Sequence, residues 1–373
     1  MTLRITKLEA LVYRAPIDTP VQTSFGTMRD RPAVFVCATD ADGVQGWGEV
    51  WCNFPTIGAE HRARLVDAVF APLVCGKAFL SPEMAFLDLT AKTEVLAIQA
   101  AEPGPVAQCI AGIDIALWDL HARRLGQPLW KLLGGKSPTI PVYASGLNPT
   151  HPEKLAAQKR AEGYRAFKLK VGFGLERDLA NLKALRAAVG DLPLMVDANQ
   201  AWDLEAAAEA ATAFEAFGLG WLEEPLRADR PWGEWQQLAS GTALGLAAGE
   251  NMAAFAVFEK ALESHALRVV QPDMAKWGGF TGCLPVAKKI LAHGMRFCPH
   301  YLGGGIGLLA SAHLLAAVGG DGMLEVDANP NPLRTLACGP LARVDEGRST
   351  LGSEPGLGFA PDPDALRAYS TGH

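Results

Sequence analysis

From residue 140 onward, short apolar segments alternate with Ala-rich segments of helical character, and this alternation restricts the possible folds strongly. The apolar segments have the length and composition of buried strands. They are Ile140–Ala144, Ala166–Val171, Leu192–Val196, Gly220–Leu222, Leu244–Ala248, Leu267–Gln271, Met295–Cys298 and Met323–Val326. The helical segments include Pro152–Gly163, Glu176–Val189, Leu204–Phe217, Ala253–Ser264, Phe280–His293 and Gly305–Val318. Eight strands with seven intervening helices predict an α/β protein with a (β/α)7β, TIM-like barrel. A doubly wound sheet is the alternative, but no Gly-rich phosphate-binding motif opens any of the helices.

The segments on either side of the barrel pattern have a different character. Residues Arg4–Tyr13, Ala33–Thr39 and Val44–Val50 read as strands, the last two as a hairpin around a turn at Asp40–Gly43. Thr19–Arg31 and Trp51–Ala59 read as loops, and Glu60–Val74 and Val106–Leu133 as helices. We expect an α+β domain over residues 1–125, the barrel over 126–334, and a C-terminal segment over 335–373 that returns to the first domain.

Charge and composition narrow the function classes. The chain has 373 residues, a formal net charge of −6 and no run of Lys or Arg, which argues against nucleic acid or an anionic membrane as a partner. It has no apolar run of about 18 residues and no signal-peptide pattern, so no membrane span is expected. Its seven scattered cysteines are typical of reduced thiols in a cytoplasmic protein.

Polar side chains follow the predicted barrel strands at the point where each strand ends. They are Lys168, Lys170, Asp197, Asn199, Glu223, Glu250, Asp273, Lys276, His300 and Glu325. From Asp197 to His300 the successive strand ends lie 23 to 27 residues apart, about one β/α unit each. Because catalytic groups of such barrels gather at the carboxyl ends of the strands, we expect these side chains to converge on one rim.

Three of these residues, Asp197, Glu223 and Glu250, end three consecutive strands. Oxygen ligands from separate rigid elements suit a hard cation such as Mg²⁺, which keeps its other positions for water and substrate. No cysteine or paired histidine lies nearby, so zinc is disfavoured. A carboxylate at the end of a strand can instead simply cap the following helix, so one such residue alone would not indicate a metal.

The remaining strand-end residues supply acid–base chemistry. Lys168 and Lys170 are two apart on a strand and therefore share a face. Two adjacent ammonium groups lower each other's pKa, which would make one of them usable as a base near neutral pH. His300 follows Asp273 by one β/α unit, and a carboxylate on one imidazole nitrogen would leave the other free to exchange protons with a substrate.

The chain carries the joint motifs K-x-K, D-x-N, E-E-P, G-E-N, D-x-x-K and P-H, and a helix motif from Gly112 to Asp119. With these motifs it resembles the mandelate racemase subgroup of the enolase superfamily over nearly its whole length. The resemblance implies that the first domain caps the barrel and that Asp197, Glu223 and Glu250 bind Mg²⁺. It implies Lys170 as one base, with Lys168 lowering its pKa and neutralising the substrate carboxylate. It implies the Asp273–His300 pair as the acid/base on the opposite face, and a protonated Glu325 as a hydrogen-bond donor to the enediolate.

Further residues are expected to contact the substrate. Asn199 and Ser145 would be secondary polar contacts, and Lys276 and Tyr301 flank the positions where this sequence departs from the type enzyme. Arg29 and Arg31 could meet a distal carboxylate.

These assignments predict Mg²⁺-dependent removal of a proton next to a carboxylate in a small-molecule substrate. Dehydration of an acid sugar to a 2-keto-3-deoxy acid is the first choice. A cycloisomerase of a sugar lactone or a racemase would use the same intermediate. A non-catalytic binding barrel would be expected to lack a base or a ligand, and a metal hydrolase would need an H-x-H pair; neither describes this chain. The resemblance also implies a homo-oligomer, a dimer or an octamer.

Overall fold

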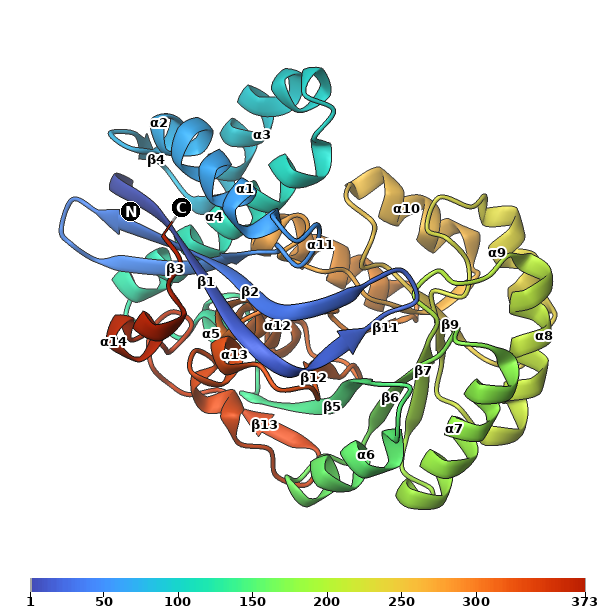
Figure 1. The fold of residues 1–373 in the computed structure, drawn as a ribbon. Coiled ribbons are helices and arrows are strands. Elements are labelled where there is room, and N and C mark those ends of the chain that lie inside the picture. Colours follow the sequence, from blue (N-terminus) through green and yellow to red (C-terminus); the bar gives the residue numbers. More distant parts are fainter. Residues whose placement is uncertain (1, 373) are drawn as a thin grey trace.

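The computed structural model describes residues 2–372, and its larger part is a ring of eight parallel strands (Figure 1). The strands are β5 (Thr139–Leu147), β6 (Phe167–Lys170), β7 (Leu194–Asp197), β8 (Leu222–Glu223), β9 (Leu246–Ala248), β10 (Leu267–Val270), β11 (Arg296–Phe297) and β12 (Leu324–Asp327). The helices between them are α6 (Pro152–Ala161), α7 (Leu175–Val189), α8 (Leu204–Phe214), α9 (Trp232–Ser240), α10 (Phe255–Ser264), α11 (Gly279–Ala292) and α12 (Gly305–Val318). The predicted eight strands and seven helices are confirmed.

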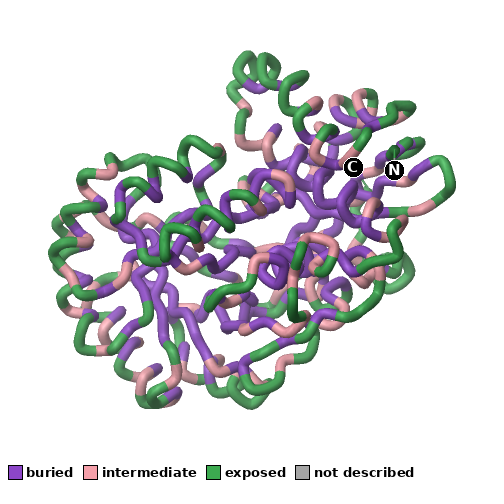
Figure 2. Tube along the Cα trace, turned by 180° about the vertical axis from the view of Figure 1, so that it is seen from behind, coloured by how far each residue is buried: buried purple, intermediate pink, exposed green. Residues whose placement is uncertain are grey.

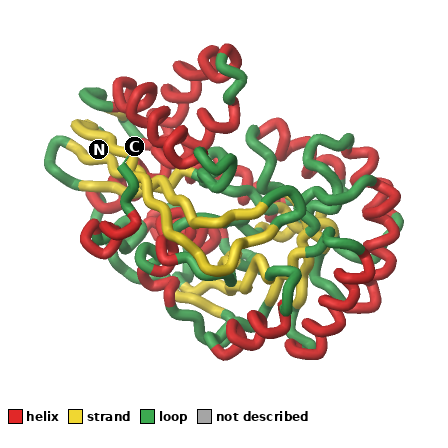
Figure 3. Tube along the Cα trace, in the orientation of Figure 1, coloured by secondary structure: helices red, strands yellow, loops and turns green. Residues whose placement is uncertain are grey.

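The strands lie side by side in chain order from β5 to β11, and β12 pairs with β5. No ladder joins β11 to β12 in the described residues, and the seam between them is closed by local contacts instead. The backbone N–H of Met323 donates to Sγ of Cys298 at 3.4 Å, and that of Tyr301 donates to Glu325 at 3.2 Å. The strands are yellow and the outer helices red in Figure 3.

The barrel interior is apolar at one end and polar at the other. Its lower layer is a separate buried cluster made of Tyr143, Ala166, Met195, Trp221, Ala247, Val269 and Cys298. Because side chains alternate along a strand, the residues two positions further on face the same interior. Those residues include Ser145, Lys168, Asp197, Glu223 and His300, so the sequence places charged groups directly above an apolar floor.

The N-terminal capping domain is built on an antiparallel sheet of order β3-β2-β1-β4. Its strands are β1 (Leu3–Gln22), β2 (Thr27–Asp40), β3 (Gln45–Val50) and β4 (Ala78–Phe79). Helices α1 (Gly58–Leu65), a π-helical turn Val66–Phe70, α2 (Ala71–Val74), α3 (Pro82–Gln99), α4 (Pro103–Arg124) and α5 (Leu129–Leu132) complete it. Figure 2 shows buried residues along the barrel strands and through the middle of the molecule.

Three features of this domain differ from the predictions. The helix predicted over Val106–Leu133 is two helices, α4 and α5, because Gly126 and Pro128 interrupt it. Thr19–Arg31 was expected to be a loop, but β1 and β2 pair as far as Gln22 and Thr27, so only Thr23–Gly26 forms the turn. Thr and Val in this segment favour strands, and this preference outweighed the turn-forming residues. Helix α3 was not predicted, although Ser81 accepts a hydrogen bond from the backbone of Met84 and Pro82 opens the helix.

The backbone of strand β3 packs directly on the backbone of α4, because glycines of the strand face the helix. A Cβ at Gly48 would lie 2.0 Å from the carbonyl oxygen of Gly112, and a Cβ at Gly46 would lie 2.2 Å from that of Ala116. The side chain of Asp119 fixes the same contact by accepting from the backbone N–H of Trp47 at 2.8 Å. The two sequence motifs G-W-G-E and G-x-D-x-A-L-W-D therefore meet at one interface.

We expect Gly48→Ala to lower the free energy of unfolding by about 3 kcal/mol, because its Cβ would meet backbone that cannot rotate away. Urea unfolding followed by circular dichroism measures the change. Gly233→Ala is the matched control, since nothing lies within 4 Å of a Cβ there and alanine favours the helix. Equal stability of the two variants would show that β3 and α4 are not in this close contact.

The C-terminal segment runs back along the capping domain. The backbone N–H of Leu357 donates to Asp119 at 2.6 Å, Ser370 forms a bridge with Tyr13, and the N–H of Thr371 donates to Val12 at 3.2 Å. These contacts agree with the predicted return, while the domain boundaries at 125 and 334 remain predictions. Within residues 2–372 no helix is long and apolar enough to cross a membrane. All seven cysteines are free thiols.

Candidate active site

Two lysines project from β6 into the barrel, and both are buried. Nζ of Lys168 lies 2.6 and 2.7 Å from the carboxylate oxygens of Glu223 and 2.8 Å from Oε1 of Glu325. Nζ of Lys170 donates to Oδ2 of Asp197 at 2.5 Å. The period-two spacing of the K-x-K motif thus places both ammonium groups on the interior, each against strand-end carboxylates.

The sequence predicts that the neighbouring ammonium group lowers the pKa of Lys170, and the structure corrects the direction of the net shift. Burial lowers this pKa, Asp197 raises it, and Lys168 lowers it, and the net shift is upward. The repulsion between the two lysines is therefore present, but the carboxylate in contact with Lys170 outweighs it.

The three carboxylates expected to bind a metal all lie at consecutive strand ends and are buried. Asp197 contacts Lys170, and Glu223 accepts from Lys168 and, at 2.6 Å, from Nε2 of Gln271. Glu250 lies 3.2 Å from Nζ of Lys276 and 2.6 Å from Nε2 of His300. Every one of them is thus neutralised by a cationic side chain.

Unpaired oxygens accompany these carboxylates. Oε2 of Glu224 and Oδ1 of Asn199 are buried without a hydrogen-bond partner among the described residues. Glu224, the second glutamate of the E-E-P motif, was not singled out from the sequence, and Glu250 and Asp197 both act on its charge. Burial and these neighbours hold the pKa of Glu224 well above its usual range. Two buried oxygens without a donor beside the strand-end carboxylates are a feature that a bound cation would satisfy.

The ligand arrangement itself is not assembled. Across residues 2–372 no group of three His, Cys, Asp or Glu side chains stands ready to hold a metal ion. The carboxylates point instead to Lys168, Lys170, Lys276 and His300. An all-oxygen set of Asp197, Glu223 and Glu250 still fits Mg²⁺ by the chemistry of its donors.

His300 and Asp273 form the expected pair. Nδ1 of His300 lies 2.7 Å from Oδ2 of Asp273. The other carboxylate oxygen of Asp273, Oδ1, accepts from the backbone N–H groups of Ala275 and Lys276 at 2.8 and 3.1 Å. The orientation of Asp273 is therefore fixed by the turn that follows β10, and Asp273 in turn fixes the imidazole. Nε2 of His300 points to the carboxylate cluster.

Glu325 occupies the predicted position at the end of β12. Its oxygens accept from Lys168, from the hydroxyl of Ser145 and from the backbone N–H of Tyr301. Burial raises the pKa of Glu325, but Lys168 and His300 lower it more strongly, so the net shift is downward. These two cations favour the carboxylate form of Glu325, and its role as a protonated donor to the enediolate stays a prediction.

The predicted substrate contacts are only partly brought together. Asn199 donates to Asp197 at 3.1 Å, and Nζ of Lys276 lies 4.8 Å from the centre of the Trp51 ring, which comes from the capping domain. The hydroxyl of Tyr301 hydrogen-bonds Glu49, another capping-domain residue that the sequence reading missed. Burial raises the pKa of Glu49 to about 7.

The two arginines lie differently with respect to the barrel mouth. Arg29 is exposed on β2, because its neighbour Met28 takes the inward position of the alternating strand. Arg31 is buried and pairs with Asp327, one alternate position beyond Glu325 on β12. The predicted contact of Arg29 with a distal carboxylate is therefore not supported, and the partner of Arg31 is within the chain.

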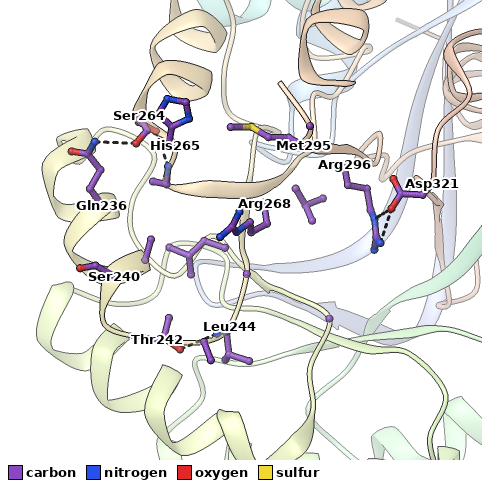
Figure 4. Close-up of a pocket in the computed structure, with 18 residues that line it drawn as sticks. Gln236, Ser240, Thr242, Leu244, Ser264, His265, Arg268, Met295, Arg296 and Asp321 are labelled. Carbon is purple, nitrogen blue, oxygen red and sulfur yellow. Dashed lines mark hydrogen bonds and ion pairs between the residues drawn. The ribbon is translucent and has the colours of Figure 1, made fainter. Parts of the chain in front are cut away.

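A large surface cavity lies at the other end of the barrel. It has a volume of about 680 Å³ and is lined by residues at or near the starts of strands, among them Gly220, Leu244, Arg268 and Arg296 (Figure 4). Arg296 pairs there with Asp321 at 2.8 Å. None of the strand-end residues described above lines this cavity, so it lies apart from the candidate active site.

Comparison with known proteins covers most of the chain. Residues 7–134 match the mandelate racemase/muconate lactonizing enzyme N-terminal domain, and residues 152–365 match the enolase C-terminal domain-like family. A solved structure of a mandelate racemase/muconate lactonizing enzyme from Bordetella bronchiseptica RB50 is 57% identical, with a TM-score of 0.94 over 99% of both chains.

Two characterised relatives represent different reactions. The 3,6-anhydro-alpha-L-galactonate cycloisomerase of Streptomyces coelicolor is 32% identical over 99% of this chain and 100% of its own. The L-talarate/galactarate dehydratase of Salmonella typhimurium is 35% identical over 71% of this chain and 66% of its own. The family matches cover both the capping domain and most of the barrel. The chain therefore belongs to the enolase superfamily, in its mandelate racemase/muconate lactonizing enzyme group.

Proposed function

We propose that this protein removes the proton next to the carboxylate of a small sugar-derived acid and then expels an oxygen from the neighbouring carbon. The observation that carries the proposal is the pair of acid–base groups at the barrel mouth. Lys170 on β6 and His300 after β11 end strands that lie nearly across the ring, with the carboxylate cluster between them. A substrate held there would meet a proton-transfer group on each face.

The first step is deprotonation of a very weak carbon acid. Lys170 or His300, whichever lies on the face of the substrate that carries the proton, takes it in its neutral form, and negative charge moves onto the carboxylate oxygens. Release of Lys170 from its contact with Asp197 would remove an interaction that raises its pKa and so favour the neutral form. Asp197, Glu223 and Glu250 would hold Mg²⁺, the ion used in this superfamily, which supplies positive charge beside those oxygens. Lys168 adds a fixed ammonium group, and its contact with Glu325 keeps it oriented.

The second step is elimination. The electron pair left by the proton forms a carbon–carbon double bond, and the bond from the β-carbon to its oxygen breaks. His300 donates a proton to the departing oxygen, and Asp273 holds the imidazole for this transfer. Ketonisation of the resulting enol gives a 2-keto-3-deoxy acid.

The departing oxygen decides the class of reaction. If it is a hydroxyl group, water leaves and the enzyme is a dehydratase. If it is a ring oxygen, the ring opens and the enzyme is a cycloisomerase, as the full-length similarity to the Streptomyces coelicolor protein favours. Dehydration is our first choice, as the 35% identity to the L-talarate/galactarate dehydratase supports, and cycloisomerisation is the second.

We expect incubation of the Mg²⁺-loaded protein with the correct open-chain aldonate or aldarate to give a 2-keto acid lighter than the substrate by one water. Mass spectrometry measures the loss, and a semicarbazide assay detects the keto group. A panel of lactones and anhydro acids serves as the comparison. A product of unchanged mass from a ring substrate, with no reaction of open-chain acids, would reject dehydration and promote the cycloisomerase.

A further inference from the structure

Glu49 is a buried carboxylate that reaches the barrel from β3 of the capping domain. Its side chain is 2% exposed and contacts the segment that follows His300. Oε1 of Glu49 accepts from the backbone N–H of Gly304 at 2.5 Å, and Oε2 accepts from that of Gly307 at 2.8 Å. The hydroxyl of Tyr301 hydrogen-bonds the same carboxylate. One side chain of the capping domain therefore holds the connection between β11 and α12 at three points.

A run of glycines makes this close approach possible. A Cβ at Gly304 would lie 2.7 Å from Oε1 of Glu49, and a Cβ at Gly303 would lie 2.4 Å from the hydroxyl oxygen of Tyr301. A Cβ at Gly307 would lie 2.2 Å from the same hydroxyl oxygen. The segment is therefore shaped around the contact between two particular side chains, which the capping of a helix alone does not require.

Tyr301 connects this contact to the acid–base groups. It directly follows His300 in the chain, and its own backbone N–H donates to Oε2 of Glu325 at 3.2 Å. Its side chain is buried, so the packing around the ring couples the hydroxyl end to the backbone. A displacement of Tyr301 would therefore shift His300 and Glu325 together.

We propose that Glu49 is a positioning residue: by holding Tyr301 it fixes His300 and Glu325 at the rim of the barrel. The inference rests on the proposed function, in which His300 transfers protons. Lys170 stands across the ring and is held by Asp197 instead. Because a misplacement of about 1 Å can cost about 10²-fold in rate, the capping domain controls the acid–base group through a residue that does not touch the substrate.

Asp114 offers a matched control for Glu49. It is also a buried carboxylate of the capping domain, on α4, and it accepts from a barrel helix. The backbone N–H and the hydroxyl of Thr281, near the start of α11, donate to it at 3.0 and 2.6 Å. The two carboxylates thus make equivalent contacts between the domains, but Thr281 lies inside its helix, whereas Tyr301 is adjacent to His300.

Glu49→Gln is expected to lower kcat by about 10- to 100-fold and to change KM by less than about threefold. The amide nitrogen of the glutamine would face one of the two backbone N–H groups that the carboxylate accepts from, which displaces the segment. Asp114→Asn should lower thermal stability to a similar degree and keep kcat within about threefold of the natural value. Equal losses of kcat in the two variants would overturn the proposal, because they would indicate a general loosening of the contact between the domains.

Tyr301→Phe tests the route of the effect, since it removes only the hydroxyl that contacts Glu49. It is expected to lower kcat several-fold in the natural chain and to add little to Glu49→Gln, because both changes break the same contact. Losses that multiply in the combined variant would show that the two residues act separately and would reject the route through Tyr301.

Chemical modification separates this proposal from the proposed function, because it needs no substrate. The rate at which diethyl pyrocarbonate modifies His300, followed at fixed pH by peptide mass spectrometry, measures how readily the reagent reaches the buried imidazole. The rate is expected to rise at least about fivefold in Glu49→Gln protein and to stay unchanged in Asp114→Asn protein. His313, buried in α12, is the internal reference for loosening of that helix.

Faster modification of His300 alone, in a protein without the proposed activity, would support the positioning role of Glu49 and reject only the proposed function. An unchanged rate at His300 in Glu49→Gln protein, or a rate that rises together with that of His313, would overturn the proposal whatever reaction the protein catalyses.

Discussion

Asp197→Asn and Glu250→Gln are each expected to lower turnover by at least about 10³-fold, because the enediolate would lose the cation that these carboxylates are proposed to hold. Each change keeps the shape of the side chain and removes one charge. Calorimetric titration of the substrate-free protein should show Mg²⁺ binding in the natural chain and none in the variants. EDTA should abolish turnover, and added Mg²⁺ should restore it.

Asp40→Asn is the matched control for these variants. Asp40 is also a buried carboxylate paired with a basic side chain, Arg124, but it lies at the β2–β3 turn of the capping domain. Its variant should bind Mg²⁺ as the natural chain does. Unchanged Mg²⁺ affinity in both Asp197→Asn and Glu250→Gln would reject the assignment of the metal site.

His300→Asn is expected to lower kcat by about 10²–10⁴-fold, the usual contribution of a positioned acid–base group. Asp273→Asn should cost nearly as much, because Asp273 contacts Nδ1 at 2.7 Å and determines which imidazole nitrogen faces the substrate. Steady-state kinetics on the identified substrate measure both effects. Substrate affinity should change much less than kcat, because the pair acts in proton transfer.

His313 provides the comparison for a buried histidine without a catalytic role. It lies in α12, accepts from the backbone N–H of Trp130 at 2.9 Å and contacts the carbonyl of Leu357 at 3.2 Å. His313→Asn should reduce thermal stability and leave kcat within a few-fold of the natural value. Near-natural kcat for both His300→Asn and Asp273→Asn would make that pair structural as well.

The barrel could be predicted from the sequence because its signal is repeated. Each strand is a short apolar run, each helix follows at a regular distance, and the polar residue after each strand marks the rim. The same logic located Lys170, Asp197, Glu223, Asp273 and His300, all of which the structure brings to one end of the barrel.

Other features could not be predicted, because they depend on contacts between distant segments. The turn at Thr23–Gly26 is short only because Val21 pairs with Met28. The charge of Glu325 depends on Lys168, which is far away in the sequence. Glu49 and Trp51 reach the barrel from the capping domain, and their position in a strand and the loop after it does not predict this contact.

Exchange of the α-proton with solvent tests the central claim most directly. The probe is an acid sugar that lacks the β-oxygen, which can lose its α-proton but cannot undergo elimination. In heavy water with Mg²⁺, proton NMR should show deuterium replacing the α-proton in the natural chain, and no replacement when Lys170→Ala is combined with His300→Asn. Turnover of the normal substrate without any exchange in this analogue, or equal exchange in the double variant, would contradict proton abstraction by these two residues.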